Sequence, residues 1–256
     1  LLVKRHVLSS KSSCLDIVTS NSENCWINPK YNKSIILIID ALRYDFIFPY
    51  ENCPGGIQKF QGNEKYYHGH MPNIAQLLRE QPSNALLFPF IAEAPTTTFQ
   101  RIKALVTGSV PAFIEAGDNF DGTKITEDNI LDQLLSMGKN ATLLGDETWL
   151  QLLPGRFHRH FEEPSFDIKD LDTVDNTVIA NIFNEINRSD WSLIIAHCLG
   201  VDHAGHRYGP AHSEMSRKLN QMDQLILNLT LNLPKDSILF VLGDHGMTAT
   251  GDHGGD

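Results

Sequence analysis

Short apolar runs alternate along the chain with longer segments in which apolar positions recur every three or four residues. The uninterrupted runs predict buried strands in the ranges 34–40, 85–95, 141–146, 191–198 and 237–244. The periodic segments predict helices in the ranges 72–81, 96–108, 125–138, 173–187 and 212–233. Because strands and helices alternate throughout, the expected fold is α/β, with a mostly parallel central sheet and helices on both of its faces.

Polar residues follow several of these expected strands. Asp40 ends the first strand, three threonines follow the second, and Asp146 and Asp244 end two others. The strand at 191–198 runs into a segment, 197–206, that is rich in Asp and His and is expected to be a loop. Ligands of open parallel sheets bind outside the carboxyl ends of the strands, so these residues are expected to share one edge.

Two glycine-containing motifs combine carboxylates with imidazoles at short spacing. They read GVDHAGH (200–206) and GDHGMTATGDHGGD (243–256), and their candidate ligands are Asp202, His203, His206, Asp244, His245 and His253. Carboxylate oxygen and imidazole nitrogen suit a borderline divalent cation such as zinc. A pair of such ions stabilises both the attacking and the leaving oxygen of a displacement at phosphorus. The sequence therefore predicts a two-metal site for chemistry at phosphorus.

The segment PTTTFQ offers a nucleophile for such chemistry. Thr96, Thr97 and Thr98 stand at the start of an expected helix, where free backbone N–H groups and the positive dipole end favour a phosphoryl oxyanion. On local evidence alone, a threonine in this position is more typical of an ordinary helix cap. The local pattern does not choose among the three.

Three further residues near the strand ends each have two interpretations. Asp40 is interpreted as a metal ligand rather than a helix cap, because other Asp-bearing strand ends are expected beside it. Arg43 is expected to pair with Asp45 or another local acid rather than to orient a phosphate or carboxylate. Asp146 is expected to cap a helix, with orientation of a metal ligand as its alternative.

Charge and hydropathy limit the kinds of partner. The chain has 31 acidic against 21 basic residues, a formal net charge of −10, which argues against nucleic acid as a partner. No stretch approaches the roughly 18 uninterrupted apolar residues of a membrane span. The start of the chain, LLVKRHVLSS, has too short an apolar run for a signal peptide.

Glycosylation sequons and cysteines bear on the compartment. Four N-x-S/T sequons lean toward a secretory-lumen or extracellular domain, with Asn32 and Asn187 favoured over those at Asn140 and Asn228. Cys198 ends an apolar strand and is expected to be a buried free thiol. Among the N-terminal cysteines, a disulfide between Cys14 and Cys25 is the pairing expected in an oxidising lumen.

The segment PTTTFQRIKALVTG resembles the nucleophile segment of the nucleotide pyrophosphatase/phosphodiesterase branch of the alkaline-phosphatase superfamily. The resemblance implies that Thr98 is the nucleophile and that Asn119 helps to hold the phosphate. It assigns one of two divalent metal ions, expected to be zinc, to Asp40, Thr98, Asp244 and His245. It assigns the other to Asp202, His206 and His253, and makes His203 a neighbour rather than a ligand.

A narrower resemblance extends over residues 34–256. The motifs DALRYDF, APTTTFQRIKALVTGSVPAFIEAGDNF, DLDTVDN and GVDHAGHRYGP are similar to those of the GPI ethanolamine phosphate transferases, in particular the type that modifies the third mannose. The resemblance implies an alkaline-phosphatase-like, C-terminally truncated domain at 34–256, preceded by a surface segment at 1–33. That domain is expected in the lumen of the endoplasmic reticulum, as a fragment of a larger membrane enzyme.

The same resemblance implies a reaction and its partners. Phosphatidylethanolamine is the expected donor, a mannose of the GPI-anchor precursor the acceptor, and a phospho-threonine the intermediate. Membrane helices outside this chain and a small membrane partner subunit belong to the same expectation. The alternative is a secreted or lumenal phosphodiesterase that hydrolyses its substrate, because the same site serves both outcomes.

Overall fold

The structure is a computed structural model that describes residues 10–13, 30–47, 66–110 and 124–255. Within these residues, strands alternate with helices along most of the chain. In chain order the elements are β1 (Lys33–Ile39), α1 (Tyr44–Ile47), α2 (Pro72–Glu80), α3 (Thr98–Thr107), α4 (Ile130–Ser136), β2 (Ala141–Asp146), α5 (Thr148–Leu152), β3 (Arg159–Glu163), α6 (Thr173–Ile186), β4 (Leu193–Cys198), α7 (Gly200–Tyr208), α8 (Ser213–Leu231) and β5 (Ser237–Leu242).

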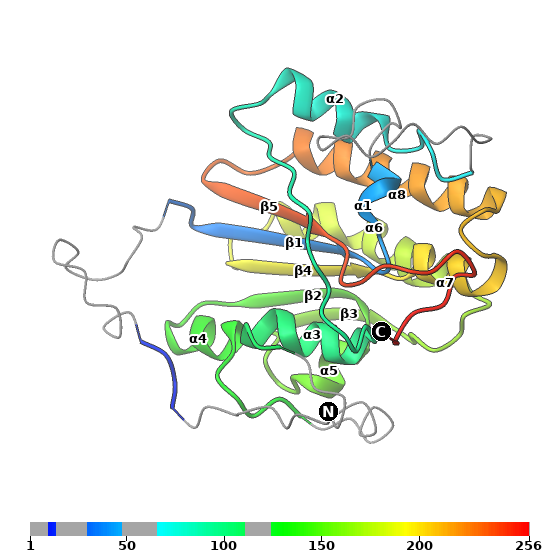
Figure 1. The fold of residues 1–256 in the computed structure, drawn as a ribbon. Coiled ribbons are helices and arrows are strands. Elements are labelled where there is room, and N and C mark those ends of the chain that lie inside the picture. The colour runs from blue at the N-terminus through cyan, green and yellow to red at the C-terminus, as the bar shows by residue number, and fades with distance from the viewer. Residues whose placement is uncertain (1–9, 14–29, 48–65, 111–123, 256) are drawn as a thin grey trace, which may run out of the picture.

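The five strands form one parallel sheet in the order β3-β2-β4-β1-β5. Every residue of β2 and β4 is buried, as expected for strands covered on both faces. In the register of the sheet, Ile39 of β1 lies opposite Cys198 of β4. The residues that follow β1, β4 and β5 therefore meet at one end of the sheet, next to α7 and the C-terminal segment (Figure 1).

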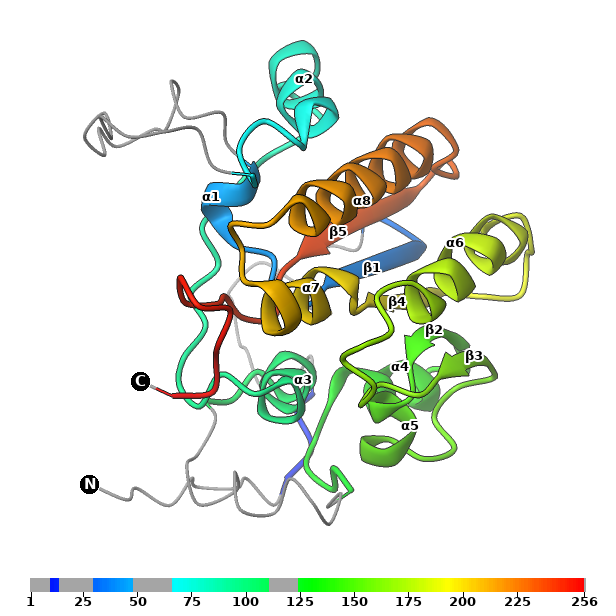
Figure 2. The same cartoon turned by 90° about the vertical axis from the view of Figure 1, so that its right-hand side faces the viewer.

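Helices cover both faces of the sheet (Figures 1 and 2). On one face α2, α6, α7 and α8 pack into a core to which β1 contributes Ile35, Leu37 and Ile39. On the other face α3, α4 and α5 pack against Ile36 and Ile38 of the same strand. The alternation of β1 side chains between two apolar layers confirms the predicted α/β fold with helices on both faces.

The strand predicted at 85–95 is wrong. This segment has no ladder partner among the described residues and crosses the sheet as an extended connection to α3 (Figure 1). Leu86, Phe88 and Ile91 are 75%, 71% and 78% exposed, and Pro89 has no N–H to donate to a ladder. Apolar composition alone had predicted a strand, but a strand also needs a neighbour with free backbone groups.

The loop predicted at 197–206 is also wrong, because β4 is followed almost at once by helix α7. Two glycines in GVDHAGH lower its helix propensity, yet tertiary contacts hold the helix. Helices α1 and α5 and strand β3 were not predicted. The helix predicted from residue 125 begins at Ile130, where the Asn129 side chain accepts a hydrogen bond from Asp132 N at 2.9 Å and caps it.

The described residues near the N-terminus can be compared with the domain boundary predicted near residue 33. β1 begins at Lys33, and Ser12 contacts the α4 region through a hydrogen bond from its N–H to Asp128 Oδ2 at 2.8 Å. Cys198 is buried and free, as predicted, whereas Cys14 and Cys25 lie outside the described residues. Among the described helices, none has both the length and the apolar character needed to span a bilayer.

Candidate metal centre

The carboxyl ends of β1 and β5, helix α7 and the C-terminal loop bring the candidate ligands into two neighbouring groups. The Asp40 group consists of Asp40, Asp244 and His245, and the Asp202 group of Asp202, His206 and His253. Within each group the ligand atoms lie within 4.8 Å of one another. The rings of His245 and His253 stack with their centroids 3.9 Å apart, so the two groups adjoin.

The Asp40 group is built where β1 and β5 end side by side. Ala41, directly after β1, is fully buried with a left-handed φ of 56°, and its N–H donates to Asp244 Oδ1 at 3.2 Å. A non-glycine residue in this conformation is strained, and such strain is concentrated at functional sites. His245 donates from Nδ1 to Gly246 O at 3.0 Å, so Nε2 is the ring nitrogen that faces Asp40 Oδ1, at 3.1 Å.

The Asp202 group joins helix α7 to the C-terminal loop. Asp202 and His206 lie one turn apart on α7, with Oδ2 and Nε2 3.4 Å apart. His253 donates from Nδ1 to Thr96 O at 2.7 Å, which leaves its Nε2 lone pair directed into the group. The loop approaches α7 so closely that a Cβ at Gly251 would lie 1.9 Å from Gly205 O.

The polar atoms of these groups fit divalent cations. Asp40 Oδ1, Asp202 Oδ1, Asp244 Oδ2 and His245 Nε2 are buried and make no hydrogen bond. The Nε2 atoms of His206 and His253 face each other at 2.8 Å. The four atoms of Asp40, Asp202, Asp244 and His245 cost about 1–3 kcal/mol each unless something satisfies them. A cation in each group would satisfy these oxygens and nitrogens, which are the ligand types of zinc.

The protonation equilibria of the groups are strongly perturbed. Burial and the neighbouring charge of Asp40 raise the pKa of Asp244 to about 6, and the same causes raise the pKa of Asp202 well above its usual value. Burial opposes the charge on His245, but Asp244 and Asp40 outweigh it and raise its pKa to about 10. Burial and the charge of His245 lower the pKa of His253 to about 4. Without cations, the carboxylates and imidazoles of the two groups therefore compete for the same protons.

The three candidate nucleophiles have different surroundings. Thr98 is the first residue of α3, and its hydroxyl donates to Asp40 Oδ2 at 3.3 Å. The Thr97 hydroxyl donates to Gln100, and Thr96 Oγ1 accepts from Gly254 N at 2.7 Å. Of the three, Thr98 is the one whose hydroxyl contacts a candidate metal ligand, and it lies at the N-terminus of a ten-residue helix.

Other candidates have structural partners. His203 lies in neither group, because its two ring nitrogens contact Asp170 O at 2.7 Å and Ser165 O at 3.2 Å. The pairing of Arg43 with Asp45 is confirmed, with two contacts of 2.6 and 2.8 Å. Asp146 lies one residue before the N-cap position of α5, and its side chain accepts from Thr148 N, the first N–H of that helix, at 2.8 Å. Its second oxygen lies 3.3 Å from His197 Nδ1. Asn119 lies outside the described residues.

Sequence reasoning missed two buried residues beside the Asp40 group. Arg101 donates from Nε to Asp244 O at 2.8 Å and from Nη1 to Glu93 O at 3.1 Å, and so ties the end of β5 to α3. His197 is a fully buried histidine in β4. The available signals were an arginine one helical turn after Thr98 and a polar residue inside the apolar run LIIAHC.

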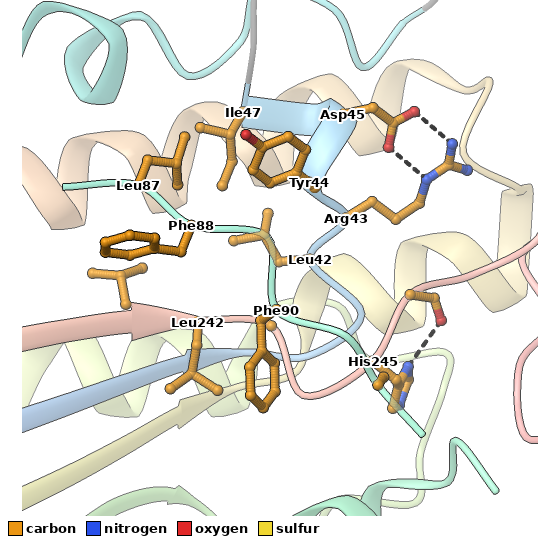
Figure 3. A pocket seen from close by; sticks show the side chains of 14 residues that line it. Leu42, Arg43, Tyr44, Asp45, Ile47, Leu87, Phe88, Phe90, Leu242 and His245 are labelled. Atoms are coloured by element: carbon orange, nitrogen blue, oxygen red, sulfur yellow. Dashed lines mark hydrogen bonds and ion pairs between the residues drawn. The ribbon is translucent and has the colours of Figure 1, made fainter. Parts of the chain in front are cut away.

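A pocket of about 310 Å³, lined by apolar side chains and by Arg43, Asp45 and His245, lies beside the Asp40 group. Figure 3 shows Leu42, Phe88, Phe90 and Leu242 around it, with His245 at one end. Residues of the segment 85–92 thus line one side of this pocket and do not pair with β5.

Comparison with known proteins extends these observations. Residues 124–255 match the model of the type I phosphodiesterase / nucleotide pyrophosphatase family. The chain is 44% identical to human GPI ethanolamine phosphate transferase 3, catalytic subunit, over 91% of its own length, and 41% identical to Saccharomyces cerevisiae GPI ethanolamine phosphate transferase 3 over its whole length. It spans 21% and 24% of these two relatives. The resemblance inferred from the motifs is confirmed.

Solved structures agree with the fold. Murine ectonucleotide pyrophosphatase/phosphodiesterase 5 aligns with a TM-score of 0.58 at 16% identity, over 84% of this chain and 57% of that one. A protein in the alkaline phosphatase superfamily from Vibrio parahaemolyticus aligns with a TM-score of 0.55 at 15% identity, over 85% and 55%. The expected alkaline-phosphatase-like fold is confirmed.

Proposed function

This chain belongs to the type I phosphodiesterase / nucleotide pyrophosphatase family, and from this premise we propose that it is the catalytic domain of a GPI ethanolamine phosphate transferase. The observation that carries the proposal is the position of Thr98, whose hydroxyl donates to Asp40 at the start of α3. The relatives named GPI ethanolamine phosphate transferase 3 favour the type that modifies the third mannose.

The partners are proposed from the names of the relatives. This chain by itself spans only about a fifth to a quarter of the length of those proteins. Phosphatidylethanolamine is the donor and the GPI precursor glycolipid is the acceptor. The domain faces the lumen of the endoplasmic reticulum, and the whole protein is held in the membrane by segments outside this chain, with a small membrane subunit as partner.

The proposed reaction has two displacements at phosphorus. The oxygen of Thr98 attacks the phosphorus of the donor, the bond to the diacylglycerol oxygen breaks, and diacylglycerol leaves with a proton. A mannose hydroxyl then attacks the phosphorus of phosphoethanolamine-Thr98, loses its proton, and Thr98 recovers its hydroxyl. Covalent catalysis of this kind replaces one difficult step by two easier ones.

The residues of the two groups have distinct parts in this proposal. Two zinc ions, when bound, supply Lewis-acid stabilisation of anionic oxygens. Asp40, Thr98, Asp244 and His245 would hold one, and Asp202, His206 and His253 the other. Asp40 accepts the hydroxyl hydrogen of Thr98 and so directs its oxygen toward the substrate. The free N–H groups at the start of α3 stabilise negative charge on the phosphoryl oxygens, and Asn119 adds a donor.

Replacing Thr98 tests this role. In membranes that contain the protein, phosphatidylethanolamine labelled in its headgroup is incubated with a GPI precursor, and label is followed in the glycolipid, in free phosphoethanolamine and on the protein. Thr98→Ala should reduce transfer by at least about a thousandfold, since losing a nucleophile costs that much or more. Labelled peptide containing Thr98 should be found in the unaltered protein when acceptor is withheld.

Thr97→Ala is the matched control, because that hydroxyl contacts Gln100 and not Asp40. Full transfer by Thr98→Ala together with loss in Thr97→Ala would contradict the assignment. Label that appears in free phosphoethanolamine at the same rate with and without acceptor would favour the second candidate, a hydrolysing phosphodiesterase. The family match, whose description is that of a phosphodiesterase, is the observation in favour of that alternative.

A further inference from the structure

A fully buried histidine lies directly behind the Asp40 group. His197 belongs to β4, and its Nε2 lies 3.5 Å from Asp40 Oδ2. On its other side, Trp149 Nε1 donates to His197 Nδ1 at 3.0 Å, and Asp146 Oδ2 lies 3.3 Å from the same nitrogen. Trp149 is also buried, with the Phe157 ring packed against its edge. The imidazole therefore connects α5 to a candidate metal ligand on β1.

The indole of Trp149 determines which nitrogen of His197 accepts and which one donates. Its Nε1–H is a donor without a lone pair, so Nδ1 of His197 must accept. A neutral imidazole then carries its only proton on Nε2, and that proton points at Asp40. Nε2 is buried and has no hydrogen-bond partner at the observed distance. The carboxylate of Asp40 is the acceptor it faces.

The neighbouring carboxylates of Asp146 and Asp40 favour the protonated form of the His197 ring instead. Although burial lowers the pKa of His197, Asp146 and Asp40 raise it to about 10. An imidazolium would bear a proton on Nδ1, 3.0 Å from the indole N–H, and two donors would then face each other. A cation held by Asp40 offsets the charge of that carboxylate and favours the neutral ring again.

The two oxygens of the Asp40 carboxylate face different partners. Oδ2 faces His197 Nε2 and accepts from the Thr98 hydroxyl, while Oδ1 faces His245 Nε2 inside the ligand group. We propose that Trp149 and His197 are positioning residues: the indole selects the imidazole tautomer that donates to Asp40 Oδ2, which directs Oδ1 to the cation. The inference rests on the proposed function in that it assumes a cation in the Asp40 group.

Replacing the indole donor while keeping an aromatic ring tests the inference. Trp149→Phe should weaken zinc binding at one of the two sites by about tenfold or more, which is typical when a partner that orients a ligand is lost. The other site should keep its affinity, as measured by calorimetric titration of the purified chain with zinc. His197→Leu should weaken the same site, and His197→Gln, whose amide can still donate to Asp40, should recover most of the loss.

Trp191→Phe is the matched control. Trp191 is equally buried and its Nε1 donates to Ile186 O at 3.3 Å, away from the Asp40 group. Both tryptophan variants should lose thermal stability, but only Trp149→Phe should lose zinc affinity. Equal zinc affinity in the two variants would overturn the inference.

A second measurement reports the tautomer itself. Nitrogen-15 NMR of labelled histidines in the zinc-loaded chain, with His197 assigned by its absence in His197→Gln, should show an unprotonated Nδ1 and a protonated Nε2. Trp149→Phe should yield a mixture of tautomers. Two protonated nitrogens in the unaltered, zinc-loaded chain at neutral pH would overturn the inference. An unaltered chain that binds no zinc in the calorimetric titration would instead contradict the proposed function.

Discussion

The side chains of the candidate ligands are oriented by backbone contacts. His245 and His253 each use Nδ1 to donate to a carbonyl, which leaves Nε2 free to bind. Asp244 accepts from the N–H of Ala41, a residue held in a left-handed conformation. Preorganisation of this kind reduces the entropy lost when an ion or substrate binds, because the side chains are already placed.

The residue types of the candidate metal centre could be predicted from the sequence, but the residues that hold them in place could not. The motifs GVDHAGH and GDHGMTATGDHGGD contain carboxylates and imidazoles whose chemistry is evident from composition and spacing. The left-handed Ala41 and the buried His197 depend on how β1, β4 and β5 lie together, and no local pattern encodes that. The choice of Thr98 among three threonines needed either a family resemblance or the geometry of Asp40.

A single glycine controls the approach of the C-terminal loop to α7. Gly251 has φ of +89°, and its added Cβ would lie 1.9 Å from Gly205 O. Gly251→Ala should therefore displace the loop that carries His253 and weaken zinc binding in the Asp202 group by about tenfold or more. The measurement is calorimetric titration with zinc.

Gly255→Ala provides the control for this substitution, since a Cβ there meets nothing within 4 Å. It should bind zinc like the unaltered chain. If Gly251→Ala retained both sites at full affinity, the loop would not depend on this close approach.

Helix α7 is held at its start by two other helices. Asp175 of α6 accepts from the N–H groups of Leu199 and Gly200 at 2.9 and 3.1 Å, and pairs with Lys218 of α8 at 2.7 Å. Lys218 is fully buried and Asp175 is 1% exposed. This buried pair fixes the beginning of the helix that presents Asp202 and His206 on one face.

Removing the buried cation should destabilise the fold. Lys218→Met leaves the carboxylate of Asp175 buried without its partner, which should lower the free energy of unfolding by about 3–5 kcal/mol. Arg217→Met, one residue earlier, removes exposed pairs with Asp172 and Glu214 and should cost no more than about 1 kcal/mol. Denaturant unfolding measures both, and equal values for the two variants would refute the role of the buried pair.

Elements with strong periodicity were predictable, and those made by tertiary contacts were not. The helices at 173–186 and 213–231 and the strands of the sheet centre follow their apolar patterns closely. The segment 85–95 has the composition of a strand but no neighbour with which to pair among the described residues. Helix α7 has two glycines and the composition of a loop, and the Asp175 contacts favour it as a helix.

At the scale of the molecule, strand order decides where the chemistry is placed. Because β4, β1 and β5 are neighbours in a parallel sheet, residues about forty to two hundred positions apart arrive at the same end of it. The alternation of strands and helices predicted this edge, whereas the order of the strands came only from the structure. In the proposed function, both displacements at phosphorus take place at this edge.

X-ray anomalous scattering from crystals of this chain grown with zinc tests the two-metal centre most directly. Two peaks at the zinc absorption edge are predicted, one among Asp40, Asp244 and His245 with Thr98 Oγ1 beside it. The other should lie among Asp202, His206 and His253. Crystals with no peak in either group, or with zinc bound only elsewhere on the surface, would contradict a zinc site in these two groups.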